Sequence, residues 1–389
     1  MNTRDLRSSI VIGLISLTSV ELLAQTNWTR RASMPTPRFW FTACAVGGKI
    51  YAIGGARSLE QKLLPTVEEY DPATDTWTQK ADMLTARAGL AAAVINGKIY
   101  VVGGAPRKEV SIPTVEVYDP TTDTWTQKAN MPTRRNFHCA SAVNGKLYAI
   151  SGQKEGAPDD PSWDINVDPR WDTRAVEAYD PATDTWTRKT DLPTQRSGAA
   201  ADVVDGRIYV IGGVTGSLHN APTSAVEEYD PVADTWTKKA SMPTARMFPS
   251  ATVMGGRIYV MGGGVWNGAI FSTVEMYDPA TDTWATHPPM NEPRFGLASG
   301  AANGRIYAIG GSGVWYPGAG MGTMEEYDPK PTVSLLRTGS TLKVYWNGLL
   351  ESSDAVDGAS WQALNPATWP FSTNLNLAGP MKFYRAREP

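Results

Sequence analysis

The phrase Tyr-Asp-Pro-Ala-Thr-Asp-Thr-Trp recurs along the chain with little change, at a step of about 50 residues. Five copies carry a tryptophan, referred to below as the repeat tryptophans: Trp77, Trp125, Trp186, Trp236 and Trp284. A pair of small residues, such as Gly54 and Gly55, keeps the same step and occurs six times. Repetition at this period predicts a fold built from equivalent units of about 50 residues.

Each unit is predicted to be a four-stranded antiparallel sheet. The first two strands flank a two-residue turn such as Asn96-Gly97, whose residue types tolerate the positive φ angles of a tight hairpin. A third strand is expected at Val67 to Tyr70 and its equivalents, and a fourth begins at each repeat tryptophan. Between them, Asp71 can accept hydrogen bonds from backbone amides and Pro72 fixes its own φ, which is typical of a turn.

The order of the small pair, the Tyr-Asp-Pro and the tryptophan resembles the Kelch-repeat β-propeller family over residues 27 to 329. The resemblance implies an all-β fold with one four-stranded blade per repeat. Six Tyr-Asp-Pro phrases are present, but the last, at Tyr327, is not followed by a tryptophan phrase; Asn27-Trp28-Thr29-Arg30 supplies that piece at the other end of the chain. We therefore expect a six-bladed propeller closed by an N-terminal outer strand, which covers an otherwise open sheet edge.

Three parts are predicted along the chain. Residues 1–24 have the layout of a cleaved export signal, with Arg4 and Arg7 before an apolar run, and they favour a secreted or periplasmic bacterial protein; a buried N-terminal segment is the alternative. Residues 25–330 form the propeller. Residues 331–389 lack the repeat and are expected to form a small all-β module resembling tails of secreted bacterial proteins, which either packs on the propeller or attaches the protein to a partner.

Composition restricts the classes of partner. With 36 Lys+Arg against 39 Asp+Glu, the chain has no basic field for nucleic acid, and no stretch after the N-terminal run resembles a membrane span. Cys44 and Cys139 fall on inner strands of nonadjacent blades, so they are expected to be small buried residues and not a disulfide. We expect a monomer without a cofactor.

A ligand is expected on one face of the propeller. One face of the propeller carries the hairpins and the Asp-Pro turns, which repeat nearly the same surface six times, and we call it the hairpin face. The opposite face carries connecting segments of variable length, and we call it the connection face. The third connection, residues 153 to 175, is about twice as long as its peers. Aromatic residues of these connections are predicted to form a stacking platform, with loop packing as the alternative: Trp163, Trp171, Trp266, Trp315 and Tyr316.

The resemblance also implies residues at the mouth of the central channel. In Kelch propellers that bind ligands, the residue after the arginine that opens each inner strand often lines this mouth. The arginines here are Arg38, Arg87, Arg135, Arg196, Arg246 and Arg294, which we expect to pair with acids or carbonyls of their blades. The implied mouth residues are Phe39, Ala88, Asn136, Ser197, Met247 and Phe295. Polar anchors for a sugar or peptide are Asn136, Ser197, Arg57, Arg107 and Arg170.

These observations favour a non-catalytic protein that binds a protein or glycan ligand. Bacterial sialic-acid mutarotases resemble six-bladed Kelch proteins, so a sugar mutarotase or epimerase is the main alternative. Such an enzyme needs an acid and a base beside the sugar ring, and the candidates are Glu155, Asp202, His138 and Arg170.

Metal chemistry has weaker support in the sequence. A copper-radical oxidase of the galactose-oxidase type would need a tyrosine linked to a cysteine and two histidines, and no such pairing is evident. His138, His219 and His287 come from three blades and can in principle meet a metal. Asp164, Asn166 and Asp168 alternate as in a calcium loop, but Pro169 and Ala175 replace the Gly and Glu that such a loop needs, which favours a solvated acidic loop.

Overall fold

The computed structural model describes residues 28–58, 63–106, 110–154, 172–215, 221–315 and 319–329, and the backbone of six further strands between residues 332 and 387. Residues Trp28–Tyr327 form one compact unit, and Asp328–Pro389 belong to another. The described residues contain β-strands and no helix, which confirms the all-β prediction. None of their segments is a helix long and apolar enough to cross a membrane.

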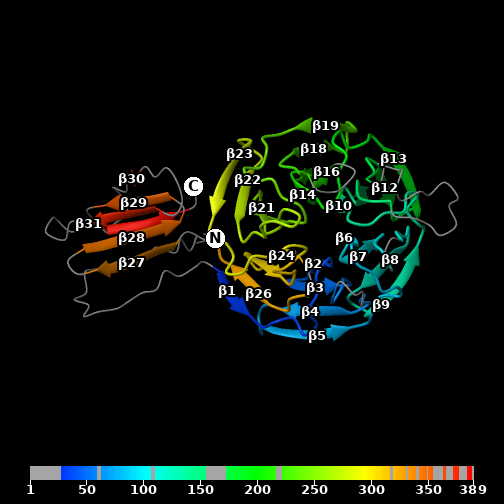
Figure 1. The fold of residues 1–389 in the computed structure, drawn as a ribbon, viewed down its shortest axis with the longest axis horizontal. Coiled ribbons are helices and arrows are strands. Elements are labelled where there is room, and N and C mark those ends of the chain that lie inside the picture. Colours follow the sequence, from blue (N-terminus) through cyan, green and yellow to red (C-terminus); the bar gives the residue numbers. More distant parts are fainter. Residues whose placement is uncertain are drawn as a thin grey trace, which may run out of the picture. The chain divides into compact units, whose positions relative to one another are not determined.

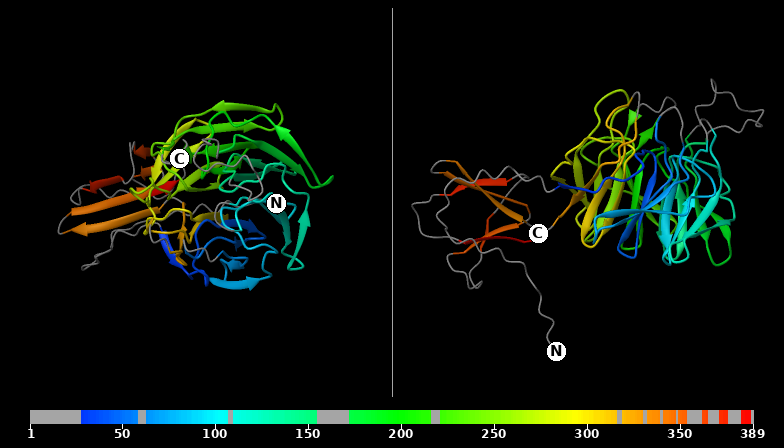
Figure 2. Two further views of the ribbon diagram at one scale, coloured as in Figure 1. Left: turned by 45° about the vertical axis from the view of Figure 1, so that its right-hand side comes forward. Right: turned by 90° about the horizontal axis from the view of Figure 1, so that it is seen from below.

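The first unit is a ring of six four-stranded antiparallel sheets, and its strands run from one face to the other (Figures 1 and 2). Blade 1 contains β2 (Thr42–Val46), β3 (Lys49–Ile53), β4 (Val67–Asp71) and β5 (Thr76–Lys80). Blade 2 contains β6 (Ala91–Ile95), β7 (Lys98–Val102), β8 (Val115–Asp119) and β9 (Thr124–Lys128). Blade 3 contains β10 (Cys139–Val143), β11 (Lys146–Ile150), β12 (Val176–Asp180) and β13 (Thr185–Lys189).

The other three blades follow the same plan, with the innermost strand first. Blade 4 contains β14 (Ala200–Val204), β15 (Arg207–Ile211), β18 (Val226–Asp230) and β19 (Thr235–Lys238); β16 (Val214–Thr215) and β17 (Ala221–Pro222) pair in its connection. Blade 5 contains β20 (Ser250–Met254), β21 (Arg257–Met261), β22 (Val274–Asp278) and β23 (Thr283–His287). Blade 6 contains β24 (Ala298–Ala302), β25 (Arg305–Ile309), β26 (Met324–Tyr327) and β1 (Trp28–Arg31).

The N-terminal strand closes the ring as predicted. β1 pairs antiparallel with β26, and Trp28 lies opposite Tyr327. The Trp28 ring stacks on the Tyr327 ring with centroids 5.1 Å apart, and its Nε1 donates to the carbonyl oxygen of Pro288 in blade 5 at 2.8 Å. Residues from the two ends of the propeller sequence therefore share one sheet.

Neighbouring blades are joined at the outer strands by the repeated phrase. In blade 1, Trp77 Nε1 donates to the carbonyl oxygen of Ala32 in the preceding blade at 2.8 Å. Asp75, at a positive φ of 54°, accepts from the Tyr70 hydroxyl at 2.7 Å and from the Ala32 amide at 2.9 Å. Blades 2 to 5 repeat these three hydrogen bonds. The aspartate and the tryptophan therefore link successive blades as well as shaping a turn.

Blade 6 lacks this aspartate because its outer strand comes from the other end of the chain. Its tyrosine, Tyr327, has a different hydrogen-bond partner, the Nδ1 of His287 at the end of blade 5, at 2.9 Å. His287 is thus part of the blade junction. Its burial lowers its pKa to about 4, so the ring is neutral near pH 7.

The six arginines before the inner strands are fully buried, each in an ion pair inside its own blade. Arg38 Nη1 donates to the carbonyl oxygens of Gly54 and Thr66 at 2.9 and 2.8 Å, and Nη2 donates to Glu68 at 2.6 Å. The guanidinium thus joins the connection face of the blade to its third strand. The structural interpretation of these arginines is confirmed.

The second unit contains two three-stranded sheets. One consists of β27 (Thr332–Thr338), β28 (Thr341–Asn347) and β31 (Phe371–Leu375). The other consists of β30 (Gln362–Leu364), β29 (Leu349–Ser353) and β32 (Phe383–Arg387). The export signal expected over residues 1–24 lies outside the described residues.

Candidate ligand-binding site

A closed ring of backbone hydrogen bonds surrounds the propeller axis on the connection face. Its members stand two positions after each buried arginine, and each amide donates to the carbonyl oxygen of the equivalent residue in the preceding blade. The six N···O distances are 2.8 to 3.1 Å. In chain order the members are Trp40, Gly89, Phe137, Gly198, Phe248 and Gly296.

Aromatic side chains and glycines alternate around this ring. Trp40, Phe137 and Phe248 come from blades 1, 3 and 5, and we call these three residues the aromatic plug. Their ring centroids are 5.1 Å (Trp40 to Phe137), 5.2 Å (Phe137 to Phe248) and 6.1 Å (Trp40 to Phe248) apart. Since side chains from three alternate blades are in mutual contact, they meet at the axis and close the channel at this end.

The glycines of the ring make room for the plug. A Cβ atom on Gly198 would lie 2.6 Å from the Phe248 ring, and one on Gly296 would lie 2.8 Å from the Trp40 ring. The three aromatic members themselves have positive φ angles of 48° to 52°, an unusual conformation for bulky residues. The surrounding hydrogen bonds hold this strained backbone in place, a situation that recurs at functional sites.

A band of aromatic side chains runs outward from the plug to blades 5 and 6. The ring centroids of Trp40 and Phe295 are 6.5 Å apart, and the Phe295 ring stacks on the Trp315 ring with centroids 4.0 Å apart. Trp315 Nε1 donates to the carbonyl oxygen of Gly268, and its ring lies 5.4 Å from that of Trp266. Trp266 is 38% exposed at the outer end of this band. We call the plug together with Phe295, Trp315 and Trp266 the aromatic band.

The predicted mouth residues lie beneath this surface. Phe39, Asn136, Ser197, Met247 and Phe295 are at most 2% exposed, and each forms a backbone bridge with the residue after the small pair. The surface at the axis belongs instead to the next residue of each blade. Aromatic residues and glycines alternate at that position in the sequence. This alternation is the sequence signal for the plug, which was not predicted.

Other predicted site residues are only partly described. Arg57 is exposed, and its carbonyl oxygen accepts a hydrogen bond from the Gly320 amide, which places the Arg57 backbone beside the later part of the blade 6 connection. Arg107, Trp163, Arg170, Trp171 and Tyr316 lie outside the described residues. The same holds for Glu155, for His219 and for the acidic segment from Asp164 to Asp168.

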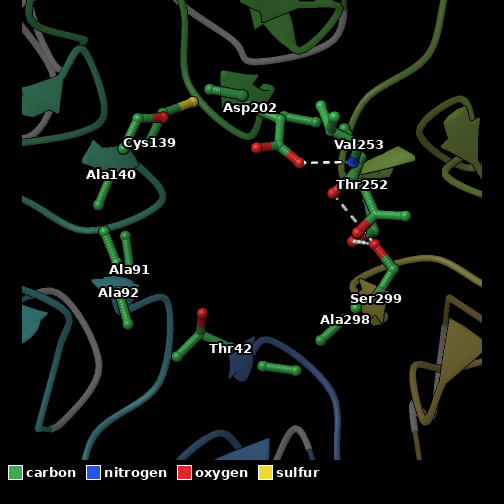
Figure 3. A pocket seen from close by; sticks show the side chains of 18 of the residues that line it. Thr42, Ala91, Ala92, Cys139, Ala140, Asp202, Thr252, Val253, Ala298 and Ser299 are labelled. Carbon is green, nitrogen blue, oxygen red and sulfur yellow. Dashed lines mark hydrogen bonds between the residues drawn. The ribbon is translucent and has the colours of Figure 1, made fainter. Parts of the chain in front are cut away.

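The central channel contains a cavity of about 460 Å³ between the plug and the hairpin face. Asp202 is the acidic residue of its wall, and its Oδ2 accepts from the Val253 amide of blade 5 at 2.8 Å (Figure 3). Its Oδ1 accepts from the Val203 amide at 2.7 Å. Desolvation raises the pKa of Asp202 to about 6, against the opposing effect of the two amides.

His138 also borders the cavity, but its ring packs in the core between blades 2 and 3. His138 occupies the position that Phe41, Leu90 and Leu297 have in other blades. Its ring packs closely on Gly103 of blade 2, since a Cβ atom there would lie 2.6 Å from the ring. Neither ring nitrogen has a hydrogen-bond partner within the described ranges. Burial and the nearby arginines Arg135 and Arg87 lower the pKa of His138 well below its ordinary value, so it is neutral.

Of the residues considered for metal chemistry, Cys44, Cys139, His138 and His287 lie in the described part of the chain. Cys44 and Cys139 are buried and free, as expected, and burial raises the pKa of each thiol to about 12. Within the described segments, no three His, Cys, Asp or Glu side chains gather closely enough to hold a metal ion.

Comparisons with known proteins agree with this architecture. Residues 24–172 match the family described as FKB95, Kelch-repeats domain, and residues 166–311 match the KLHDC2/KLHL20/DRC7 Kelch-repeats domain. A segment of 48 residues is 42% identical to the F-box/kelch-repeat protein At1g16250 of Arabidopsis thaliana, and it covers 12% of this chain and 12% of that relative. The six blades and the two family matches together identify the chain as a Kelch-repeat β-propeller, a fold that typically serves protein interaction.

Proposed function

We propose that the protein is a non-catalytic binding protein that recognises a segment of a protein ligand on its connection face. The observation that carries this proposal is the aromatic band, in which the partly exposed plug residues at the axis are linked through the buried Phe295 and Trp315 to the exposed Trp266 of blade 5. Aromatic residues are enriched where proteins bind each other, because they bury a large area at a small cost in conformational entropy.

The outer end of the band suggests the chemistry of the ligand. Trp266 and Val314 are 38% and 51% exposed, which is unusual for large apolar side chains that serve the core alone. Arg57 lies beside the same connection and adds a cationic group. We therefore expect a ligand segment that presents an apolar side chain next to a carboxylate.

Peptide selection tests this proposal. The purified protein is used to select binders from a random displayed peptide library, and affinities are measured for single variants. Trp266→Ala and Arg57→Ala should each weaken the selected peptides by about tenfold, since interface tryptophans and arginines commonly contribute more than 1 kcal/mol. Val232→Ala is the matched control, because Val232 is 85% exposed on the opposite face. Peptides that lose affinity with Val232→Ala but not with Trp266→Ala would contradict the proposal.

Two finer points belong to the same proposal. A glycan is the other ligand class expected for an exposed tryptophan on this face, and a glycan array with the same three variants tests it. Export is supported by the layout of residues 1–24, with a basic start before an apolar run. Mass spectrometry of the mature protein should show a new N-terminus near Gln25 if this segment is a cleaved signal.

A further inference from the structure

The central channel is a second candidate site, separate from the aromatic band. The aromatic plug closes it toward the connection face, and the cavity of about 460 Å³ begins immediately below, at the level of Phe41 and Leu90. A volume of this size is within the range of about 300–1,000 Å³ found for small-molecule sites. The cavity ends at the fourth residues of the inner strands, such as Ala45 and Ala142, which precede the hairpins and are partly exposed. The channel is therefore accessible from the hairpin face.

Most polar side chains of the channel wall lie on one side and most alanines on the other. Blades 4 to 6 contribute Asp202, Ser250, Thr252 and Ser299, blades 2 and 3 contribute Ala91, Ala92, Ala93 and Ala140, and Thr42 and Ser141 add two further hydroxyls to the wall. Figure 3 shows Asp202, Thr252 and Ser299 on one side of the pocket, with Ala91, Ala92 and Ala140 opposite. A ligand with one polar end and a short apolar body matches this division.

The charge of the wall is negative. Its lining includes no Lys and no Arg, and its histidine, His138, is neutral. The other titratable group there is the thiol of Cys139, which is protonated because burial raises its pKa. Asp202 accepts one amide hydrogen bond on each oxygen, and a carboxylate has about four acceptor positions, so it can accept more.

A hydroxyl of the same wall also has capacity to bind. Ser141 is 4% exposed and lines the cavity, and its Oγ has no hydrogen-bond partner within the described part of the chain. Buried hydroxyls are usually hydrogen-bonded, since leaving one unpaired costs about 1–3 kcal/mol. A polar ligand in the cavity would give Ser141 the partner that it lacks among the described residues.

We propose that the channel binds a small organic ammonium ion, with the ammonium group on Asp202 and the alkyl body against the alanines of blades 2 and 3. A primary ammonium has three N–H donors for the Asp202 carboxylate and for hydroxyls of the same wall, which include Ser141 and Thr252. Because the wall holds no other charge, an ion pair in this sheltered site is stronger than one on the surface.

Titration with a matched series of probes tests the proposal. Binding of n-butylammonium chloride to the full-length protein is measured by calorimetry, next to n-butanol and sodium butyrate, which have similar size but no positive charge. We expect n-butylammonium to bind, the other two not to bind, and Asp202→Asn to weaken n-butylammonium by about tenfold or more, since this variant removes the charge and keeps the shape. Absence of n-butylammonium binding, or equal binding by Asp202→Asn, would overturn the proposal.

A second pair of variants tests the direction of access. Ala45→Trp, near the hairpin end of the channel, should obstruct it and abolish binding, whereas Trp266→Ala on the connection face should leave it unchanged. If Ala45→Trp does not fold, as judged by circular dichroism, Ala142→Trp tests the same end from another blade. Unchanged binding in a folded variant of this kind would show that the site is not the channel.

Discussion

Buried polar side chains that look like functional residues in the sequence have two different roles in this propeller. His138 packs where other blades have Leu or Phe, and neither of its nitrogens has a partner among the described residues. His287 is also buried, but its Nδ1 shares a hydrogen bond with Tyr327 at the junction of blades 5 and 6. Sequence alone does not separate these cases, because the difference lies in which atoms from other blades surround each ring.

The first prediction compares these two histidines. His138→Leu should raise the free energy of unfolding by about 1 kcal/mol or more, because it removes a buried polar group without a partner. His287→Leu should lower it, because this variant removes the buried hydrogen bond between the His287 ring and the Tyr327 hydroxyl. Urea unfolding of both variants measures the two signs. If both substitutions change stability in the same direction, the two histidines do not differ in the way described.

The second prediction concerns pH. The pKa of His138 in the folded state is well below its ordinary value of about 6.5, so only the unfolded chain takes up a proton as the pH falls through that value. His138 therefore makes the protein less stable below about pH 6.5, and His138→Leu should make the decline shallower. His287, whose folded pKa is about 4, contributes in the same direction. Unfolding midpoints measured from pH 8 to pH 5 check this; parallel curves for the variant and the wild type would contradict it.

At the scale of elements, the chain's repeats made the blades predictable. The small pair, the two-residue turn and the Tyr-Asp-Pro recur in each unit, so the strand order within a blade and the number of blades followed from position along the chain. The closing strand could be predicted because one tryptophan phrase was missing at the end and present at the start. The aromatic plug was not predicted, since it depends on contacts among three alternate blades and on a pattern that repeats every second unit.

The third prediction tests the closing strand. Trp28 is 3% exposed, stacks on Tyr327 and donates to Pro288, so it holds β1 against two blades. Trp28→Ala should cost about 3–5 kcal/mol, as is typical for a buried tryptophan. Thermal unfolding should show a clearly lower midpoint than for Trp266→Ala, which removes a partly exposed ring from a connection. Equal midpoints for the two variants would mean that β1 contributes little to closure.

On the scale of the whole molecule, the aromatic plug divides the propeller into two separate surfaces. The plug belongs to the aromatic band of the connection face, and the channel with Asp202 lies on its other side. The plug residues touch one another and are held by the closed hydrogen-bonded ring, so a ligand on one side does not reach the other. The two proposed sites should therefore be independent of each other.

This independence gives the fourth prediction. Trp266→Ala should weaken a peptide selected on the connection face and leave n-butylammonium binding unchanged, while Asp202→Asn should do the reverse. Calorimetric titration of both variants with both probes measures the four affinities. The comparison also separates the two proposals, since loss of peptide binding alone tests the connection face and loss of n-butylammonium binding alone tests the channel. If saturation with n-butylammonium changes the affinity for the peptide, the plug couples the two surfaces, because binding effects between two sites are reciprocal.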